Sequence, residues 1–244
     1  MPAHLHWDQW IGTASFRPYA PEIYHPAIWR TWQDFGTGWS GDIGCHIFDA
    51  VWKGLGMKAP ISVIAEVQKS WQNSPERRAD TWPQGNHITW QFPGNELTEK
   101  ETFQLEWFDG EFYPPKEIMD LYKDGEYPAE SSMLIGTEGA LLIPHQKMPV
   151  YIPFGKPKEV KIPTLAERNH YHHFVDACLG GEKTESHFAQ SGPMTEAVLL
   201  GTIAIRIPDQ LLIWDSAKMK FPNYPAAEKL LKRTYRKGWE VKGI

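Results

Sequence analysis

The sequence has only two cysteines, Cys45 and Cys178, among its 244 residues. Two thiols cannot build the framework of several disulfides that holds small secreted domains together. Both lie in apolar patterns that are typical of helices, so we expect buried thiols that leave the redox compartment undecided. The chain also lacks an apolar run of about 20 residues, the length that spans a membrane. We therefore expect no membrane partner.

A strong charge of either sign is also absent, since the formal net charge is −5 at pH 7. This balance gives no reason to expect a nucleic-acid partner. The N-terminus lacks the pattern of a signal peptide, which favours the cytoplasm, while the periplasm stays open if a targeting segment is missing. A basic cluster near the C-terminus fits the dipole of a helix predicted from Pro225 to about Tyr235. Its members are Lys229, Lys232, Arg233, Arg236 and Lys237.

The sequence has no Walker loop and no Gly-x-Ser-x-Gly elbow. The letters of a dinucleotide fingerprint do occur, as Gly36-x-Gly38-x-x-Gly41. That fingerprint needs a buried strand that enters a tight turn and then a helix. Residues 29–35 contain no β-branched run, and Trp39 stands in the turn where backbone would approach phosphate. We therefore predict that these glycines bind no cofactor.

Three histidines, His170, His172 and His173, lie close together in the sequence, and histidine is a common metal ligand. A capping box, Thr164-x-x-Glu167, predicts that they lie within a helix that ends at the glycines 180 and 181. No carboxylate or cysteine is spaced convincingly with them. We expect a structural or surface role and no metal site.

Tryptophan is abundant, with 12 in the chain, and residues 1–38 form an aromatic, proline-punctuated segment that we expect to be extended or looping. Irregular chain of this kind can form the wall of a ligand site as well as a core. Arginines in the same segment could bind hydroxyls or carboxylates, with ion pairs inside the fold as the alternative. The candidate substrate-binding residues are Trp7, Arg17, Tyr19, His25, Trp29, Arg30 and Trp32.

Hydrophobic periodicity predicts the order helix, several strands, then helices, which is typical of an α+β fold. The alternating strands predict a large open, mainly antiparallel sheet with helices packed on one face. No repeat or linker divides the chain, so we expect a single domain over residues 1–244. The predicted helices cover 40–55, 164–179, 197–205 and 225–235, and the predicted strands cover 61–67, 88–92, 103–107, 132–135, 140–143 and 211–214.

The predicted helix over 40–55 carries Asp42 and His46 four residues apart, and therefore on one face. A carboxylate beside an imidazole can hold a proton-transfer group near neutral pH. Asp49 lies on the same face, and Gly41 and Gly44 would let another group approach. In the structural alternative, the carboxylate of Asp42 stabilises the partial positive charge at the helix N-terminus, and His46 is a hydrogen-bonded core histidine.

The stretch of residues 36–49, Gly-Thr-Gly-Trp-Ser-Gly-Asp-Ile-Gly-Cys-His-Ile-Phe-Asp, resembles the Asp-x-x-x-His helix of the glucose–fructose oxidoreductase/inositol dehydrogenase (Gfo/Idh/MocA) family. Further blocks at 6–12, 17–19, 195–201, 214–215 and 235–239 agree with the C-terminal substrate domain of that family. The resemblance implies an oxidoreductase that uses NAD or NADP, acts on a sugar or polyol and forms a homo-oligomer through its sheet. It also implies that Asp42 and His46 are the substrate-side catalytic pair. Because Asp49 lies on the same face of this helix, we count it among the candidate substrate-binding residues.

The chain departs from the family plan because it begins where the second domain begins, without the Rossmann domain, and has no Glu-Lys-Pro motif. The cofactor carries the hydride chemistry, and we expect that this chain alone does not bind it. The leading prediction is the substrate-binding and oligomerisation domain of an NAD(P)-dependent oxidoreductase. It is either a truncated product or the partner of a separate Rossmann-domain chain.

Two alternatives to this prediction stay open. The first is a non-catalytic carbohydrate-binding or assembly module, in which the aromatic segment binds the sugar. The second is a cofactor-independent lyase or hydrolase that acts on keto-sugars, with Asp42 and His46 as acid and base.

Overall fold

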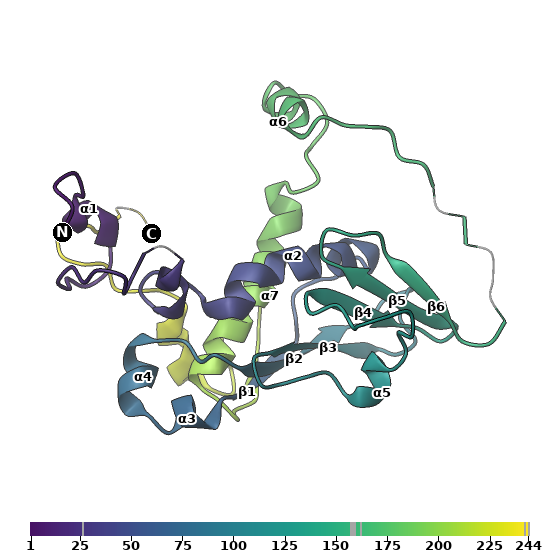
Figure 1. Ribbon diagram of the computed structural model, residues 1–244, viewed down its shortest axis with the longest axis horizontal. Coiled ribbons are helices and arrows are strands. Elements are labelled where there is room, and N and C mark those ends of the chain that lie inside the picture. The colour runs from purple at the N-terminus through teal and green to yellow at the C-terminus, as the bar shows by residue number, and fades with distance from the viewer. Residues whose placement is uncertain (26, 157–159, 162, 242, 244) are drawn as a thin grey trace.

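The computed structural model describes residues 1–25, 27–156, 160–161, 163–241 and 243. It confirms the predicted α+β class (Figure 1). The helical segments are α1 (Trp7–Ile11), η1 (Ile28–Thr31), α2 (Gly38–Gly54), α3 (Lys69–Gln72), α4 (Pro75–Asp80), α5 (Lys116–Met119), α6 (His170–Cys178), α7 (Phe188–Arg206) and η2 (Pro225–Leu230). The strands are β1 (Ser62–Val67), β2 (Asn86–Pro93), β3 (Thr102–Asp109), β4 (Ser131–Ile135), β5 (Gly139–Pro144), β6 (Val150–Pro153) and β7 (Leu212–Ile213).

The strands form two antiparallel sheets. Their orders are β3-β2-β1-β7 and β4-β5-β6. The predicted large sheet is thus divided in two, because residues 110–130, which include α5, lead the chain out of the first sheet before β4 begins. Helices α2 and α7 pack together and cover one face of the first sheet, as the sequence predicts (Figure 1).

The main core lies between this sheet and the two helices. Buried and half-buried residues alternate along β2, and Trp90 lies at the centre of its buried face. α7 is buried on nearly every side between Ala197 and Ile205. A Cβ atom at Gly201 would lie 2.4 Å from the Trp90 ring, so a glycine is what lets α7 approach β2 this closely. The indole Nε1 of Trp90 donates a hydrogen bond of 2.9 Å to the carbonyl of Ala197.

A carboxyl group is buried at the end of the same sheet. Asp109 accepts hydrogen bonds from the backbone N of Asn86 at 2.6 Å and from Nε1 of Trp107 at 2.7 Å. Burial raises the pKa of Asp109, although these hydrogen bonds act in the opposite direction.

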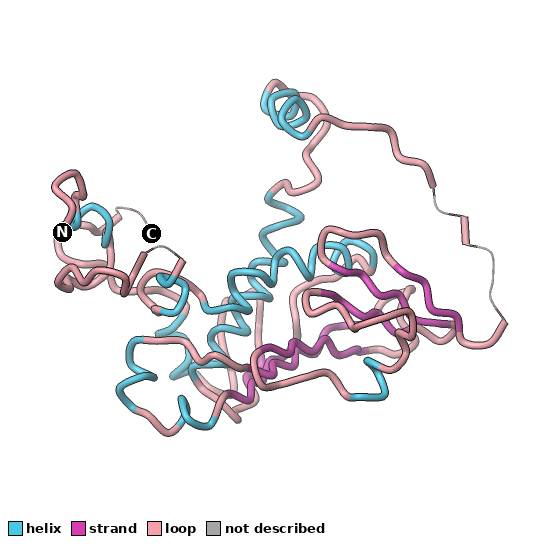
Figure 2. The backbone as a smooth tube through the Cα atoms, in the orientation of Figure 1, coloured by secondary structure: helices cyan, strands magenta, loops and turns pink. Residues whose placement is uncertain are grey.

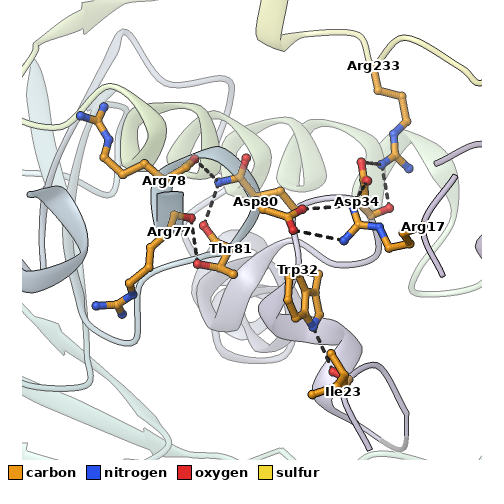
Figure 3. Close-up of polar contacts among 10 residues, drawn as sticks. Arg17, Ile23, Trp32, Asp34, Arg77, Arg78, Asp80, Thr81 and Arg233 are labelled. Atoms are coloured by element: carbon orange, nitrogen blue, oxygen red, sulfur yellow. Dashed lines mark hydrogen bonds and ion pairs between the residues drawn. The ribbon is translucent and has the colours of Figure 1, made fainter. Parts of the chain in front are cut away.

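Residues 1–25 and 27–36, which we call the aromatic module, form a second cluster. Arg17 joins this module to the body of the molecule, because its guanidinium is ion-paired with Asp34 in the module and with Asp80 at the end of α4 (Figure 3). Arg233 adds a second contact to Asp34, at 3.3 Å. The rings that pack together in the module are Trp7, Trp10, Tyr19, Tyr24, Trp32 and Phe35.

From the sequence we expected the basic cluster near the C-terminus to complement a helix dipole. The structure shows that this prediction is wrong. The predicted helix is a short 3₁₀ segment that ends at Leu230, before most of the cluster. Arg233 and Arg236 instead pair with carboxylates of the aromatic module, those of Asp34 and Asp8. These pairs hold the C-terminal segment against the module.

The predicted helix after residue 164 begins later than its capping box indicates. α6 starts at His170, and the side chain of Asn169 caps it by accepting a hydrogen bond from the His172 backbone N at 3.0 Å. Figures 1 and 2 show α6 apart from the body, after the loop of residues 163–169. No residue of α6 is buried, and Cys178 is exposed, so the predicted buried thiol is wrong there, whereas Cys45 is half-buried.

Within the described part of the chain, no helix combines the length and the apolar character that crossing a membrane requires.

Candidate functional site

The predicted pair Asp42 and His46 lies on α2, which begins two residues earlier than the sequence pattern indicates. Asp42 is fixed at the seam between η1 and α2, because Nε of Arg30 donates a hydrogen bond of 2.6 Å to its Oδ2 atom. The guanidinium of Arg30 lies 4.4 Å from the ring centroid of Trp29, a cation–π contact that restrains the arginine. Three of the predicted site residues therefore contact one another in series: Trp29 contacts Arg30, and Arg30 contacts Asp42.

His46 lies one turn further along α2 and is exposed. Its ring centroid is 5.3 Å from that of His145, at the end of β5. Nδ1 of His145 is 2.9 Å from Oε2 of Glu130, and the backbone N of His145 donates to the Glu130 carbonyl at 2.8 Å. An ionised carboxylate only accepts hydrogen bonds, so we assign the proton to Nδ1 and the free lone pair to Nε2 of His145.

The second sheet brings His145 to α2. Ser132 on β4 donates a hydrogen bond of 2.6 Å from its hydroxyl to the carbonyl of Ile47. β4 pairs with β5 from Ser131 opposite Pro144 onward, so the next residue, His145, lies beside the same turn of the helix. Sequence reasoning missed His145 and Glu130, since they reach His46 only through this tertiary contact.

Asp49 and Lys53 continue the polar stripe of α2 toward its C-terminal end. Nζ of Lys53 lies 3.5 Å from Asp49 and 3.6 Å from Glu185. These ion pairs are open to solvent and contribute little stability, and Asp49 keeps one carboxylate oxygen outside its pair with Lys53.

The remaining candidates are distributed over the aromatic module. Arg17 is ion-paired. Burial acts to lower its pKa, but the contacts with Asp80 and Asp34 together outweigh burial and raise the pKa. Tyr19 packs edge-on against Trp7, Nε1 of Trp32 donates to the Ile23 carbonyl at 3.1 Å, and His25 is exposed in a turn. The structure thus shows ion pairs inside the fold for both arginines. Substrate binding by the candidate residues stays a prediction.

The glycine fingerprint has a packing role. The 3₁₀ segment η1, and not a strand, precedes it. A Cβ atom at Gly36 would lie 2.8 Å from Cα of Arg30, and one at Gly41 would lie 2.4 Å from the Thr37 side chain. Because the strand pairs of the described residues are antiparallel, that part of the chain also contains no parallel βαβ unit to hold a dinucleotide.

The histidines of α6 are not brought to a common ligand position. Among the residues that the structure describes, no group of three or more His, Cys, Asp or Glu side chains could hold a metal ion.

Residues 1–110 match the family model described as "Oxidoreductase family, C-terminal alpha/beta domain", of the Gfo/Idh/MocA group. The match covers the aromatic module, α2 and the strands β1 to β3. The predicted resemblance to the C-terminal domain of this oxidoreductase family is therefore confirmed over that range. No curated protein matches the chain.

Proposed function

We propose that this chain is the substrate side of an oxidoreductase that oxidises a hydroxyl group of a sugar or polyol. The observation that carries the proposal is the contact between the exposed imidazole of His46 and the oriented imidazole of His145, on the helix whose sequence matches the family. An imidazole oriented by a carboxylate, as His145 is by Glu130, is a common proton-transfer group in catalysis.

In this proposal His46 accepts the proton of the substrate hydroxyl. Asp42 presents Oδ1 as a hydrogen-bond acceptor for a neighbouring hydroxyl, because Arg30 occupies Oδ2. His145, in ring contact with His46, would take that proton on Nε2 and give its Nδ1 proton to Glu130, whose side chain is 46% exposed and can release it to solvent. NAD or NADP would supply the hydride acceptor, and since the described strand pairs form no parallel βαβ unit, we place it outside residues 1–244.

Calorimetric titration of the chain with D-glucose and with myo-inositol tests this proposal. We expect saturable binding that His46→Gln and His145→Gln each weaken by about tenfold, the cost of one hydrogen bond to the ligand. His4→Gln is the matched control, since His4 is exposed in the aromatic module, and it should bind as the wild type does.

The two alternative functions give different results. Tight binding of NAD by this chain alone would contradict the placement of the cofactor. Polyol binding that is unchanged in both His46→Gln and His145→Gln would favour the non-catalytic binding module. Turnover of a keto-sugar without added cofactor would favour the lyase or hydrolase.

We also propose a homo-oligomer formed through the first sheet. The face opposite α2 and α7 carries mostly polar side chains, together with Phe108, whose ring stacks on His87 at 4.4 Å. The exposed Gln104 lies on this face of β3. Analytical ultracentrifugation tests this oligomer. Gln104→Arg should shift the oligomer toward the monomer, whereas Gln9→Arg, at an exposed position of α1, should not. A wild-type chain that sediments as a monomer at all concentrations would exclude the oligomer.

A further inference from the structure

A pocket of about 460 Å³ lies between α4, the C-terminal end of α7 and η2. It is separate from the polar stripe of α2, with which it shares no residue. Its lining combines three cationic side chains with a tyrosine and small or apolar residues, and none of these residues is acidic. The lining residues are Pro75, Arg78, Ala79, Arg206, Ile207, Tyr224, Ala226, Lys229 and Leu230.

The cations of this pocket lack carboxylate partners. Among the described residues, the guanidinium of Arg206 and the ammonium of Lys229 make no hydrogen bond or ion pair. Burial lowers the pKa of Arg206, and no acidic group offsets that effect. Arg78 donates from Nη2 to the Arg206 carbonyl at 3.4 Å and lies 5.8 Å from the Trp71 ring, which leaves its other donors free.

The acidic residues of the adjoining segments do not neutralise the pocket. On α4, Glu76 accepts a hydrogen bond from Ser74, and Asp80 is ion-paired with Arg17. Figure 3 shows the guanidinium of Arg78 directed away from the Asp80 and Arg17 cluster. Glu228 lies on η2 but does not line the pocket.

Arg77 likewise has no carboxylate partner in the described part of the chain and donates to Ser70 and Gln68, whereas four other arginines are arranged differently. Arg17, Arg30, Arg233 and Arg236 are each ion-paired with an aspartate. The chain has 30 acidic residues against 25 Lys and Arg, so carboxylates are in excess. Arg78, Arg206 and Lys229 are exposed to solvent, and three cations that converge on one pocket without a carboxylate can attract an anion from outside the chain.

We propose that this pocket binds a small organic anion through a phosphate or carboxylate group. Arg78 and Arg206 offer planar donor pairs that match either group, and Lys229 adds a point charge. The volume lies in the range of small-molecule sites and exceeds the need of a single inorganic ion. Tyr224, Ile207 and Leu230 provide the apolar wall for the body of such a ligand.

Calorimetric titration with inorganic pyrophosphate and with citrate tests the proposal and distinguishes phosphate from carboxylate recognition. Neither probe is a sugar or polyol, so the result is independent of the function proposed for α2. We expect saturable binding that weakens as salt is added. Arg206→Gln and Lys229→Gln should each weaken it by about tenfold, and Arg206→Lys should retain part of the affinity.

Lys58→Gln is the control variant, because Lys58 is exposed and lies outside the pocket. It removes the same charge and should leave the affinity unchanged, while thermal melting verifies that every variant is folded. The proposal is overturned if neither probe binds saturably, or if Lys58→Gln weakens binding as much as Arg206→Gln does.

Discussion

Both the body of the molecule and the aromatic module are rich in tryptophan, yet different forces hold their rings in place. In the body, Trp90 is almost completely buried and touches the backbone of α7. In the module, the rings surround the guanidinium of Arg17, whose carboxylate partners lie in both regions. The body therefore depends on close packing, whereas the attachment of the module depends on charge.

The largest effect should come from adding one methyl group to the body. Gly201→Ala would place Cβ 2.4 Å from the Trp90 ring, and we expect a loss of about 3 kcal/mol in the free energy of unfolding, measured by urea denaturation. Gly44→Ala is the matched control, because its Cβ would lie 3.5 Å from Val198. That variant should gain up to about 1 kcal/mol from helix propensity, and an equal loss in both variants would contradict the account of the packing.

The next effect should follow from the loss of the charge that anchors the module. Arg17→Gln leaves Asp34 and Asp80 without their shared partner, so we expect a loss of about 2 kcal/mol. Near-UV circular dichroism should show that rings of the module lose their fixed environment. Arg233→Gln removes a more exposed partner of Asp34 and should cost less than about 1 kcal/mol. A module that keeps its signal in Arg17→Gln would refute the ionic anchor.

A smaller, pH-dependent effect is expected from Asp109 in the body. Because burial raises its pKa above the usual 3.8, the folded state binds this proton more tightly than the unfolded state does. The contribution of the group is therefore present at low pH and decreases as the pH rises through the folded pKa. Urea denaturation from about pH 4 upward should show that the wild type loses stability relative to Asp109→Asn. A difference that moves in the other direction would contradict the dominant role of burial.

The smallest change in stability should come from Glu130→Gln, since the ion pair with His145 is half-exposed and contributes less than about 1 kcal/mol. The tautomer should nevertheless change. Nitrogen-15 spectra of the histidine rings should show the proton on Nδ1 of His145 in the wild type and a shift toward Nε2 in the variant. An unchanged tautomer would mean that Glu130 does not orient this ring.

Local patterns predicted the elements of the body, while tertiary contacts decided the site. Alternation and helical periodicity predicted β2 and α2 within a few residues, because both bury one face of a regular element. His145 was missed, since only the hydrogen bond from Ser132 to Ile47 brings its hairpin to α2. The sequence could not decide between substrate binding and an ion pair for Arg17, because the partner Asp80 lies 63 residues away. The capping box predicted the wrong start for α6, a helix that has no buried residue and so no tertiary packing to extend it.

The central claim is that the exposed face of α2 binds the substrate. Chemical-shift mapping of the nitrogen-15-labelled chain during titration with D-glucose and myo-inositol tests it most directly. The account predicts that the saturable shifts centre on Asp42, His46 and His145, and that His46→Gln reduces them. Shifts confined to the aromatic module or to the open face of the first sheet would contradict it.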